Sequence, residues 1–290
     1  MSETKTKMQM SETKRKKRKR VSEGDDVKEG KRIRNGGFKT DGFEVFQRFL
    51  SKRALTLIRS KFDEVYAEKH EDIDPEWVLN LHLDEEKHGQ WIKRIACHPK
   101  LVSYLRREEH FGPDRDFYLY CSQCSTKPAR GECSHVPWHQ DGDGTVRTVW
   151  IALDDVSSKN GGLVVMRGGH DRGRRTLKHV KSEKELSDAI RHAKYNVFAI
   201  QDNDIVNKAT YAYEFPAGGA GIHHPLLPHM SYRNTTDRAR RVLILRYTTD
   251  KDAKNDECFL HYRTMKPTPK KSFLVKPYID ENKDSLLLLL

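Results

Sequence analysis

The sequence predicts a mainly β domain with flanking helices, in which the helices pack on a barrel or sandwich. Two observations support this fold class. Stretches with a helical repeat of apolar residues occur first, between residues 51 and 109. From Asp116 onward the chain turns to short segments rich in β-branched and aromatic residues, separated by Gly, Asn and Asp. A chain of 290 residues has room for one such domain with tails.

Residues 1–36 form the first segment, and they lack the apolar side chains that a core needs, so we expect them to be disordered. They hold 13 Lys and Arg against 6 Asp and Glu, which gives +7 of the net charge of +12. Residues 14–20 are all basic, and a second basic cluster occupies residues 31–34. This spacing is typical of a bipartite signal for a nuclear import receptor; the alternative is a solvated tail that binds nucleic acid weakly.

The compartment follows from features that are missing from the sequence. No apolar run is long enough to span a bilayer, and the N-terminus lacks the apolar segment of a signal peptide. The five Cys, an odd number, agree with a reducing compartment. We therefore expect a nuclear or cytoplasmic protein that is neither secreted nor bound to a membrane. The final Leu-Leu-Leu differs from Ser-Lys-Leu, so we expect no C-terminal peroxisomal signal.

Order is expected from residue 37 to residue 265, and the Lys-rich residues 266–290 are expected to be a tail. A short strand over residues 42–46 begins the domain, and Ser51 then suits a helix N-cap. Further helices are expected over residues 85–96 and 99–109. The buried face of the helix after Ser51 is predicted to contain Leu55, Ile58, Phe62 and Val65.

The second half of the domain is expected to be built from strands. A capping box, Ser182 with Glu185, predicts one inserted helix that ends near residue 193. Alternation and turn residues predict strands over residues 116–124, 145–153, 163–166, 195–200, 211–215 and 241–249.

The stretch Pro137-Trp138-His139-Gln140-Asp141 contains the most distinctive chemistry. Residues i and i+2 of a strand point to the same face, so the imidazole of His139 and the carboxylate of Asp141 can reach one point. They are two of the three ligands of a facial triad, which binds Fe(II) and leaves other positions open. The third ligand is expected to be a later His. The candidates are His170, His179, His192, His223, His224, His229 and His261.

The sequence resembles the phytanoyl-CoA dioxygenase family over residues 42–249, through four motifs in order. Members are Fe(II)- and 2-oxoglutarate-dependent oxygenases on a double-stranded β-helix, a cupin-like jelly roll. The resemblance therefore implies this fold, and a dioxygenase that uses O2 to hydroxylate a C–H bond and releases succinate and CO2. The motifs are Pro-Trp-His-Gln-Asp at 137–141, Val-Trp-Ile-Ala-Leu-Asp-Asp at 149–155, Asn-Gly-Gly-Leu at 160–163, and His229-x-Ser231-x-x-Asn234 followed by Arg240.

The resemblance also implies the roles of single residues. His139, Asp141 and His229 would bind Fe(II). The planar guanidinium of Arg240 would pair with the far carboxylate of 2-oxoglutarate. The cosubstrate pocket would further include Ser231 as a hydrogen-bond donor, Trp150 as a wall and Lys127, which occupies a position that is basic in many relatives.

The sequence departs from the family pattern in two places. The first concerns the substrate, and the second concerns two additional His residues near His229. Relatives usually have Pro-Gly-Ser-His where this chain has Arg-Gly-Gly-His at residues 167–170, so the resemblance does not identify the substrate, which is a small molecule or a modified macromolecule. His223 and His224 are extra imidazoles, and we expect them at core or mouth positions.

Two other functions remain as alternatives to the dioxygenase. One is a jelly-roll protein that binds a nuclear or nucleic-acid partner, and the other is a zinc-assisted hydrolase with the same triad.

A second metal site is suggested by a cluster of thiols. Cys121, Cys124, Cys133 and His135 offer three thiols and an imidazole, a complete tetrahedral set for a structural zinc ion. The alternative is that Cys121 and Cys124, on a predicted strand, are small apolar core residues.

Overall fold

The structure is a computed structural model, which describes residues 37–131, 135–141, 144–173, 177–179, 198–200, 209–253, 260–266 and 271–277. The predicted tail at residues 1–36, the predicted helix at residues 182–193, Cys133 and the residues after 277 lie outside these ranges. None of the helices in the described ranges combines the length and apolar character that a membrane span requires.

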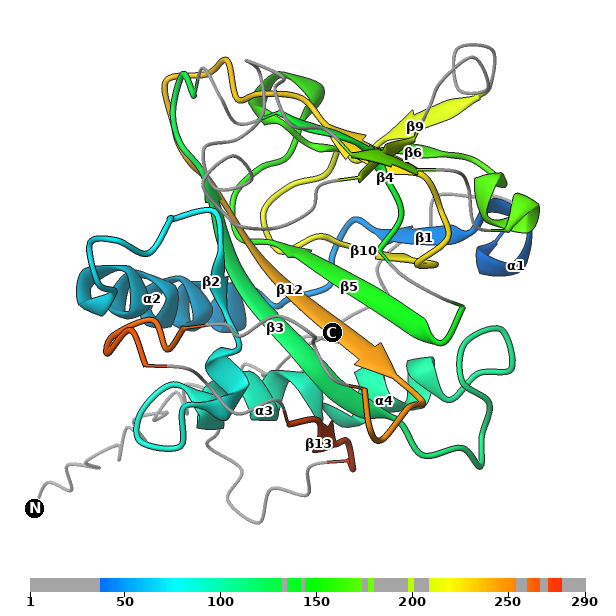
Figure 1. Cartoon of the computed structure of the whole chain (residues 1–290), viewed down its shortest axis with the longest axis horizontal. Helices are drawn as coiled ribbons and strands as arrows, with labels where there is room; N and C mark the ends of the chain where they lie inside the picture. The colour runs from blue at the N-terminus through cyan, green and yellow to red at the C-terminus, as the bar shows by residue number, and fades with distance from the viewer. Residues whose placement is uncertain are drawn as a thin grey trace, which may run out of the picture.

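Two antiparallel sheets form the body of the domain (Figure 1). In the larger sheet the strand order is β1 (Phe43–Phe46), β10 (Ala220–His223), β5 (Val146–Ala152), β12 (Arg240–Thr248), β3 (Tyr118–Lys127) and β13 (Phe273–Leu274), with β2 (Val78–Leu79) also beside β3. The smaller sheet has the order β4 (Val136–His139), β11 (His229–Ser231), β6 (Leu163–Met166) and β9 (Thr210–Ala212). A separate ribbon pairs β7 (Leu177–His179) with β8 (Phe198–Ile200).

Helices cover the face of the larger sheet that lies away from the smaller sheet (Figure 1). This layer consists of α2 (Lys52–Glu68), α3 (Gly89–Ala96) and α4 (Pro99–Leu105). The remaining short elements are α1 (Phe38–Asp41), η1 (Leu81–Leu83), η2 (Ser158–Asn160) and η3 (Gly169–Arg172).

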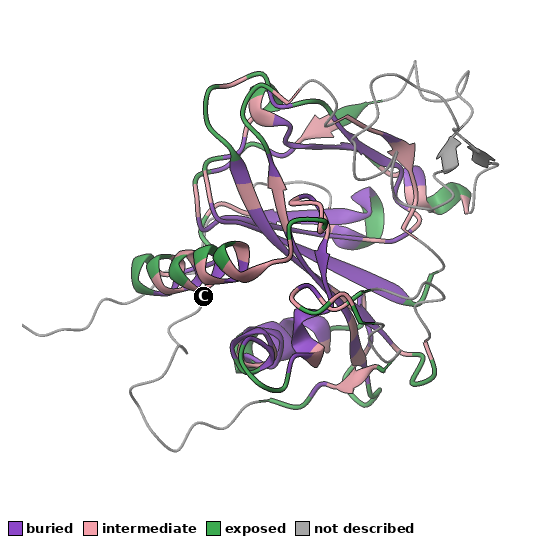
Figure 2. Ribbon diagram, turned by 60° about the vertical axis from the view of Figure 1, so that its left-hand side comes forward, coloured by how far each residue is buried: buried purple, intermediate pink, exposed green. Residues whose placement is uncertain are grey.

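Strict alternation along the central strands produces two cores, one on each side of the larger sheet. On β12, Leu243 and Leu245 pack against the helices, whereas Val242 and Ile244 face the smaller sheet. The central strands are accordingly buried between both layers (Figure 2). Mainly antiparallel strands in two facing sheets with flanking helices confirm the predicted jelly roll.

Local sequence patterns placed most elements correctly. The Ser51 hydroxyl caps α2 by accepting from the Ala54 amide at 3.1 Å, as expected. The predicted helix over residues 85–96 begins later, at Gly89, because the chain first turns and the Gly89 amide donates to the Asp84 carbonyl at 2.7 Å. A Cβ at Gly89 would lie 2.3 Å from that carbonyl oxygen, so this tight turn requires glycine.

Candidate active site

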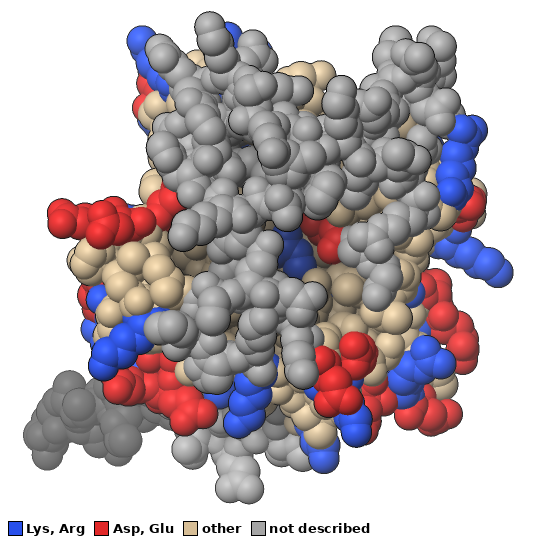
Figure 3. Space-filling view, viewed as in Figure 1, with Lys and Arg blue, Asp and Glu red and all other residues tan. Residues whose placement is uncertain are grey.

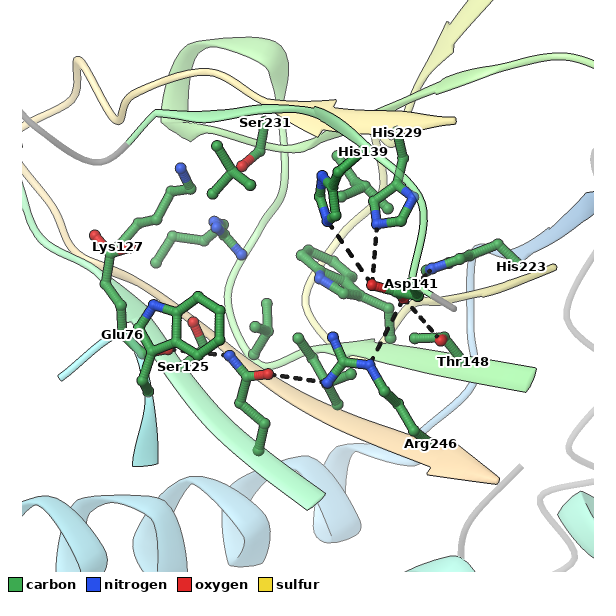
Figure 4. A pocket seen from close by; sticks show the side chains of 18 residues that line it. Glu76, Ser125, Lys127, His139, Asp141, Thr148, His223, His229, Ser231 and Arg246 are labelled. Carbon is green, nitrogen blue, oxygen red and sulfur yellow. Dashed lines mark hydrogen bonds and ion pairs between the residues drawn. The ribbon is translucent and has the colours of Figure 1, made fainter. Parts of the chain in front are cut away.

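Strand pairing in the smaller sheet brings two distant imidazoles together. His139 at the end of β4 lies directly opposite His229 at the start of β11, and their ring centroids are 4.1 Å apart. Asp141 follows two residues after His139, and its amide donates to the Pro225 carbonyl at 2.9 Å. All three side chains point into one cavity between the sheets (Figure 4).

The ligand atoms of these residues lie close enough to share one metal ion. Oδ1 of Asp141 is 3.8 Å from Nε2 of His139 and 3.6 Å from Nε2 of His229. Nδ1 of His139 donates to the Pro137 carbonyl at 2.8 Å, and Nδ1 of His229 donates to the Leu227 carbonyl at 2.9 Å. Because each Nδ1 carries the proton, each Nε2 presents its lone pair to the shared point.

The protonation states of the site also suit a cation. Burial, with repulsion from His229, lowers the pKa of His139 to about 3, so this imidazole is neutral at physiological pH. Burial alone would raise the pKa of Asp141, but Arg246 and His229 outweigh it and hold this pKa well below its usual value. A neutral His139 and an ionised Asp141 are the states that a divalent metal requires of these two ligands.

The other end of the cavity contains the predicted cosubstrate residues. The side chain of Arg240 lies over Trp150, with Cζ 5.2 Å from the ring centroid, and its Nε donates to the Asn160 carbonyl at 3.2 Å. Arg240 is only 3% exposed, and its Nη1 has no hydrogen-bond partner among the residues that the structure describes. A buried guanidinium with an unused donor is costly unless an anion binds to it. Ser231 lines the same space.

Lys127 adds a second cation beside this guanidinium. It is directly opposite Arg240 in the β3–β12 pair, and its Nζ donates to the Tyr232 carbonyl at 2.8 Å. Burial, together with repulsion from Arg240, lowers the pKa of Lys127 to about 7, although Glu76 opposes the shift. Lys127 thus lies beside Arg240 in the cavity wall, and its role toward a cosubstrate stays a prediction.

Sequence reasoning missed several residues around Asp141. Thr148 donates to its Oδ2 at 3.1 Å, and Nε2 of His223 and Nε of Arg246 lie 3.5 and 3.6 Å from the same atom. Strand periodicity offered a signal for two of them, since Thr148 is two residues before Trp150 and Arg246 is six residues after Arg240. His223 is buried in the cavity wall, which agrees with the expected core or mouth position.

The unusual loop at residues 167–170 is bound by the start of the domain. The Gly168 amide donates to the Asp41 carbonyl at 2.9 Å, and Arg167 forms an ion pair with the Asp41 carboxylate at 3.5 Å. Nε2 of His170 donates to the Lys39 carbonyl at 3.2 Å. The residues that depart from the family motif, 167–170, therefore hold this loop against α1.

The predicted zinc site is not supported. Cys124 is opposite Leu243 and belongs to the core on the helix side, whereas Cys121 is opposite Arg246 on the cavity side. Paired residues of antiparallel strands share a face, so the two thiols point away from each other and cannot bind one ion. The ring of His135 instead lies 6.4 Å from that of Tyr232. Among the described residues, Cys121 and Cys124 are therefore small buried residues of a strand, which was the alternative to a zinc site.

Two curated proteins are similar to part of this chain. "Phytanoyl-CoA dioxygenase domain-containing protein 1" of Danio rerio is 29% identical over 162 residues, which cover 52% of this chain and 50% of that protein. "L-proline trans-4-hydroxylase" of Streptomyces griseoviridis is 29% identical over 169 residues, which cover 53% of this chain and 61% of that protein. The matches thus span about half to three fifths of these relatives.

Solved structures and a family profile extend the likeness to most of the domain. The α-ketoglutarate-dependent carbocyclase SnoK from nogalamycin biosynthesis superposes with a TM-score of 0.56 at 22% identity, over 82% of this chain and 94% of that one. This likeness supports the fold. The profile of the phytanoyl-CoA dioxygenase (PhyH) family matches residues 38–242, more than half of the sequence. The chain belongs to the phytanoyl-CoA dioxygenase family.

Proposed function

We propose that this protein is an Fe(II)- and 2-oxoglutarate-dependent dioxygenase that hydroxylates a C–H bond. The observation that carries the proposal is the joint geometry of one cavity. Three metal-ligand atoms converge at one end, and the unpaired donor of buried Arg240 lies at the other.

The donor set fits Fe(II). His139, Asp141 and His229 offer two nitrogens and one oxygen within 4.8 Å of one another, as in a facial triad. With Fe(II), 2-oxoglutarate and O2 bound, the site would supply the oxidation that converts a C–H bond to C–OH, with succinate and CO2 as coproducts. The role of the protein is to hold the ligands, orient the cosubstrate and exclude water.

The cosubstrate is proposed to bind between the triad and Arg240. Its far carboxylate would take two hydrogen bonds from the guanidinium, which already has its plane set by contact with Trp150. Ser231 would donate to the same carboxylate, and the Lys127 ammonium would add charge. The cavity is lined by all four of these residues, which supports the assignment.

The substrate is proposed to be a small molecule, or a small group on a macromolecule, that enters the same cavity. One relative is named as an L-proline hydroxylase, whereas the name of the other gives only its domain, so these relatives do not fix the substrate. The residues that differ most plainly from the family motif, 167–170, are docked on α1.

The test is anaerobic titration of the metal-free protein with Fe(II) and then 2-oxoglutarate, followed by addition of O2. We expect saturable binding of both and formation of succinate only when O2 is admitted. Hydrolysis of an added ester or amide by the Zn(II)-loaded protein in the absence of O2, with no succinate formed, would instead indicate the zinc-assisted hydrolase. Binding of metal and cosubstrate with no succinate in any condition would indicate the binding protein.

We further propose that residues 1–36 direct nuclear import, that residues 37–265 carry catalysis and that residues 266–290 form a tail. The two basic clusters support the first part. In the view of Figure 3, the basic side chains of the described residues lie interspersed with acidic ones around the edge of the molecule. A fluorescent reporter fused to residues 1–36 should accumulate in the nucleus, and a variant with residues 14–20 changed to alanine should not.

Weak nucleic-acid binding by the same tail is the alternative proposal. It predicts that binding to duplex DNA falls as salt rises, with a log–log slope of about 0.9 per phosphate neutralised. Succinate formation by the full chain should not follow that slope. If it did, the tail would contribute to the active site, and the proposed division of the chain would be wrong.

A further inference from the structure

The two oxygens of Asp141 lie in different surroundings. Oδ1 faces Nε2 of His139 and of His229, the two imidazoles of the proposed metal site. Oδ2 faces away from them, toward Thr148 at 3.1 Å, His223 at 3.5 Å and Arg246 at 3.6 Å (Figure 4). The carboxylate side chain is 8% exposed, so water competes little for these contacts.

Arg246 is itself held in place. Its Nη1 donates to Oε1 of Gln123 at 3.1 Å, and the Gln123 amide donates to the Glu76 carbonyl at 3.1 Å. These contacts make a chain of donors and acceptors from the backbone before β2, across β3, to Asp141. The guanidinium is therefore held by β3 through Nη1 while its Nε faces Asp141.

We propose that Arg246 is a positioning residue that, supported by Gln123, occupies Oδ2 of Asp141 so that only Oδ1 is free to bind the metal. This inference rests on the proposed function. A carboxylate can bind a cation through one oxygen or two, and a second oxygen would use a coordination position that a facial triad leaves open. A guanidinium is suited to the task, since it stays charged beside Oδ2 of Asp141 while its Nη1 donates to Gln123.

The contacts favour Arg246 over its neighbours for this role. Thr148 is neutral and donates one hydrogen bond, whereas Arg246 adds a positive charge in a desolvated setting, where attraction between opposite charges is stronger. Arg240, on the same strand face, lies at the other end of the cavity with Trp150 and does not contact Asp141 in the described structure. The two arginines therefore have separate tasks.

The experiment compares Arg246→Gln with the wild-type full chain. The metal-free proteins are titrated with Co(II), whose visible absorption reports ligand number and geometry, under conditions where circular dichroism shows both to be folded. We expect Co(II) affinity to fall about 10- to 100-fold in R246Q, the range found when outer partners of metal ligands are removed. The absorption spectrum should also change, because the carboxylate is free to bind through both oxygens.

Arg241→Gln is the matched control. Arg241 is the same residue type on the same strand, but it points to the opposite face and pairs with Asp154 at 2.9 Å and with Asp63 at 2.7 Å. R241Q should lose stability without any change in Co(II) affinity or spectrum. A metal defect of equal size in both variants would mean that lost stability, not position, weakens the site, and would overturn the proposal.

Gln123→Leu tests the support for Arg246. Q123L alone should weaken Co(II) binding less than R246Q does, and the double variant should bind no more weakly than R246Q, because both act through one contact. Additive losses would contradict this chain of contacts.

Arg246→Lys keeps the positive charge but lacks the planar guanidinium. Its affinity for Co(II) should therefore lie between those of R246Q and the wild type.

Two further outcomes separate this proposal from the proposed function. If wild-type protein binds neither Co(II) nor Fe(II), the proposed function fails. If the wild type binds metal and forms succinate, but R246Q binds Co(II) equally well with an unchanged spectrum, only the positioning role fails. Loss of activity on an anionic substrate in such a variant would assign Arg246 to substrate binding instead.

Discussion

Replacing Arg240 by alanine should separate cosubstrate binding from stability. The guanidinium is 3% exposed and has an unused donor at Nη1, whereas Arg241, the next residue, donates to Asp154 and Asp63 on the outside of the sheet. Loss of a desolvated charge pair costs about 2–5 kcal/mol, so R240A should weaken 2-oxoglutarate binding by about 30-fold to several thousand-fold.

Arg241→Ala is the control, and we expect it to affect stability rather than cosubstrate binding. A partly exposed ion pair contributes at most about 1 kcal/mol, so R241A should change the cosubstrate KM by less than about fivefold and lower the thermal midpoint slightly. R240A should keep its thermal midpoint in the metal-free state, because removal of a buried charge without a full set of partners also removes its desolvation cost.

The assay is succinate formation at varied 2-oxoglutarate, with calorimetric titration of the anaerobic Fe(II) protein as an independent measure of affinity. Differential scanning calorimetry of the metal-free proteins gives the midpoints. Equal KM changes in R240A and R241A would refute the assignment of Arg240, and so would an unchanged dissociation constant in R240A.

Three further results are expected. His139→Ala, Asp141→Ala and His229→Ala should each abolish succinate formation and retain native circular dichroism; full activity of H229A would move the third ligand elsewhere. The affinity for 2-oxoglutarate should be highest below pH 7 and fall above it. Lys127 has a pKa of about 7 in the free cavity, so it is already protonated at low pH but must take up a proton at higher pH to pair with the dianion. Calorimetry should find that Lys127→Met removes this pH dependence. Phe62→Ala, which empties a site 1% exposed in α2, should lower the free energy of unfolding by about 3–5 kcal/mol in denaturant titrations and leave the KM unchanged; a loss below about 1 kcal/mol would contradict its place in the core.

Local patterns in the sequence determined those features that depend on neighbours along the chain. The 3.6-residue repeat placed Ile58, Phe62 and Val65 on the buried face of α2, and the Ser51 cap set its start. Leu55 is only partly buried, and Ala54 takes the inward position instead. The end of α3 and the start of α4 were predicted correctly, but α3 begins later than expected, at Gly89, and α4 ends earlier, at Leu105.

The spacing of His139 and Asp141 was likewise enough to pair them, because two residues of a strand share a face whatever the rest of the chain does. The pairing of His139 with His229 was not contained in either segment. It depends on the β4–β11 register, which a slip of one residue would reverse. The family resemblance, and not local periodicity, predicted that His229 joins His139 and Asp141.

Only the tertiary structure decided the surroundings of Asp141 and the fate of the thiols. Arg246 reaches Asp141 because β12 lies beside β5 and runs across the same cavity. Alternation sends Cys121 and Cys124, three positions apart, to opposite faces of β3, and the β3–β12 pairing decides which thiol meets the helices and which meets the cavity. Periodicity tells which face a side chain takes, but contacts between strands far apart in sequence are set by sheet order, which is a property of the whole fold.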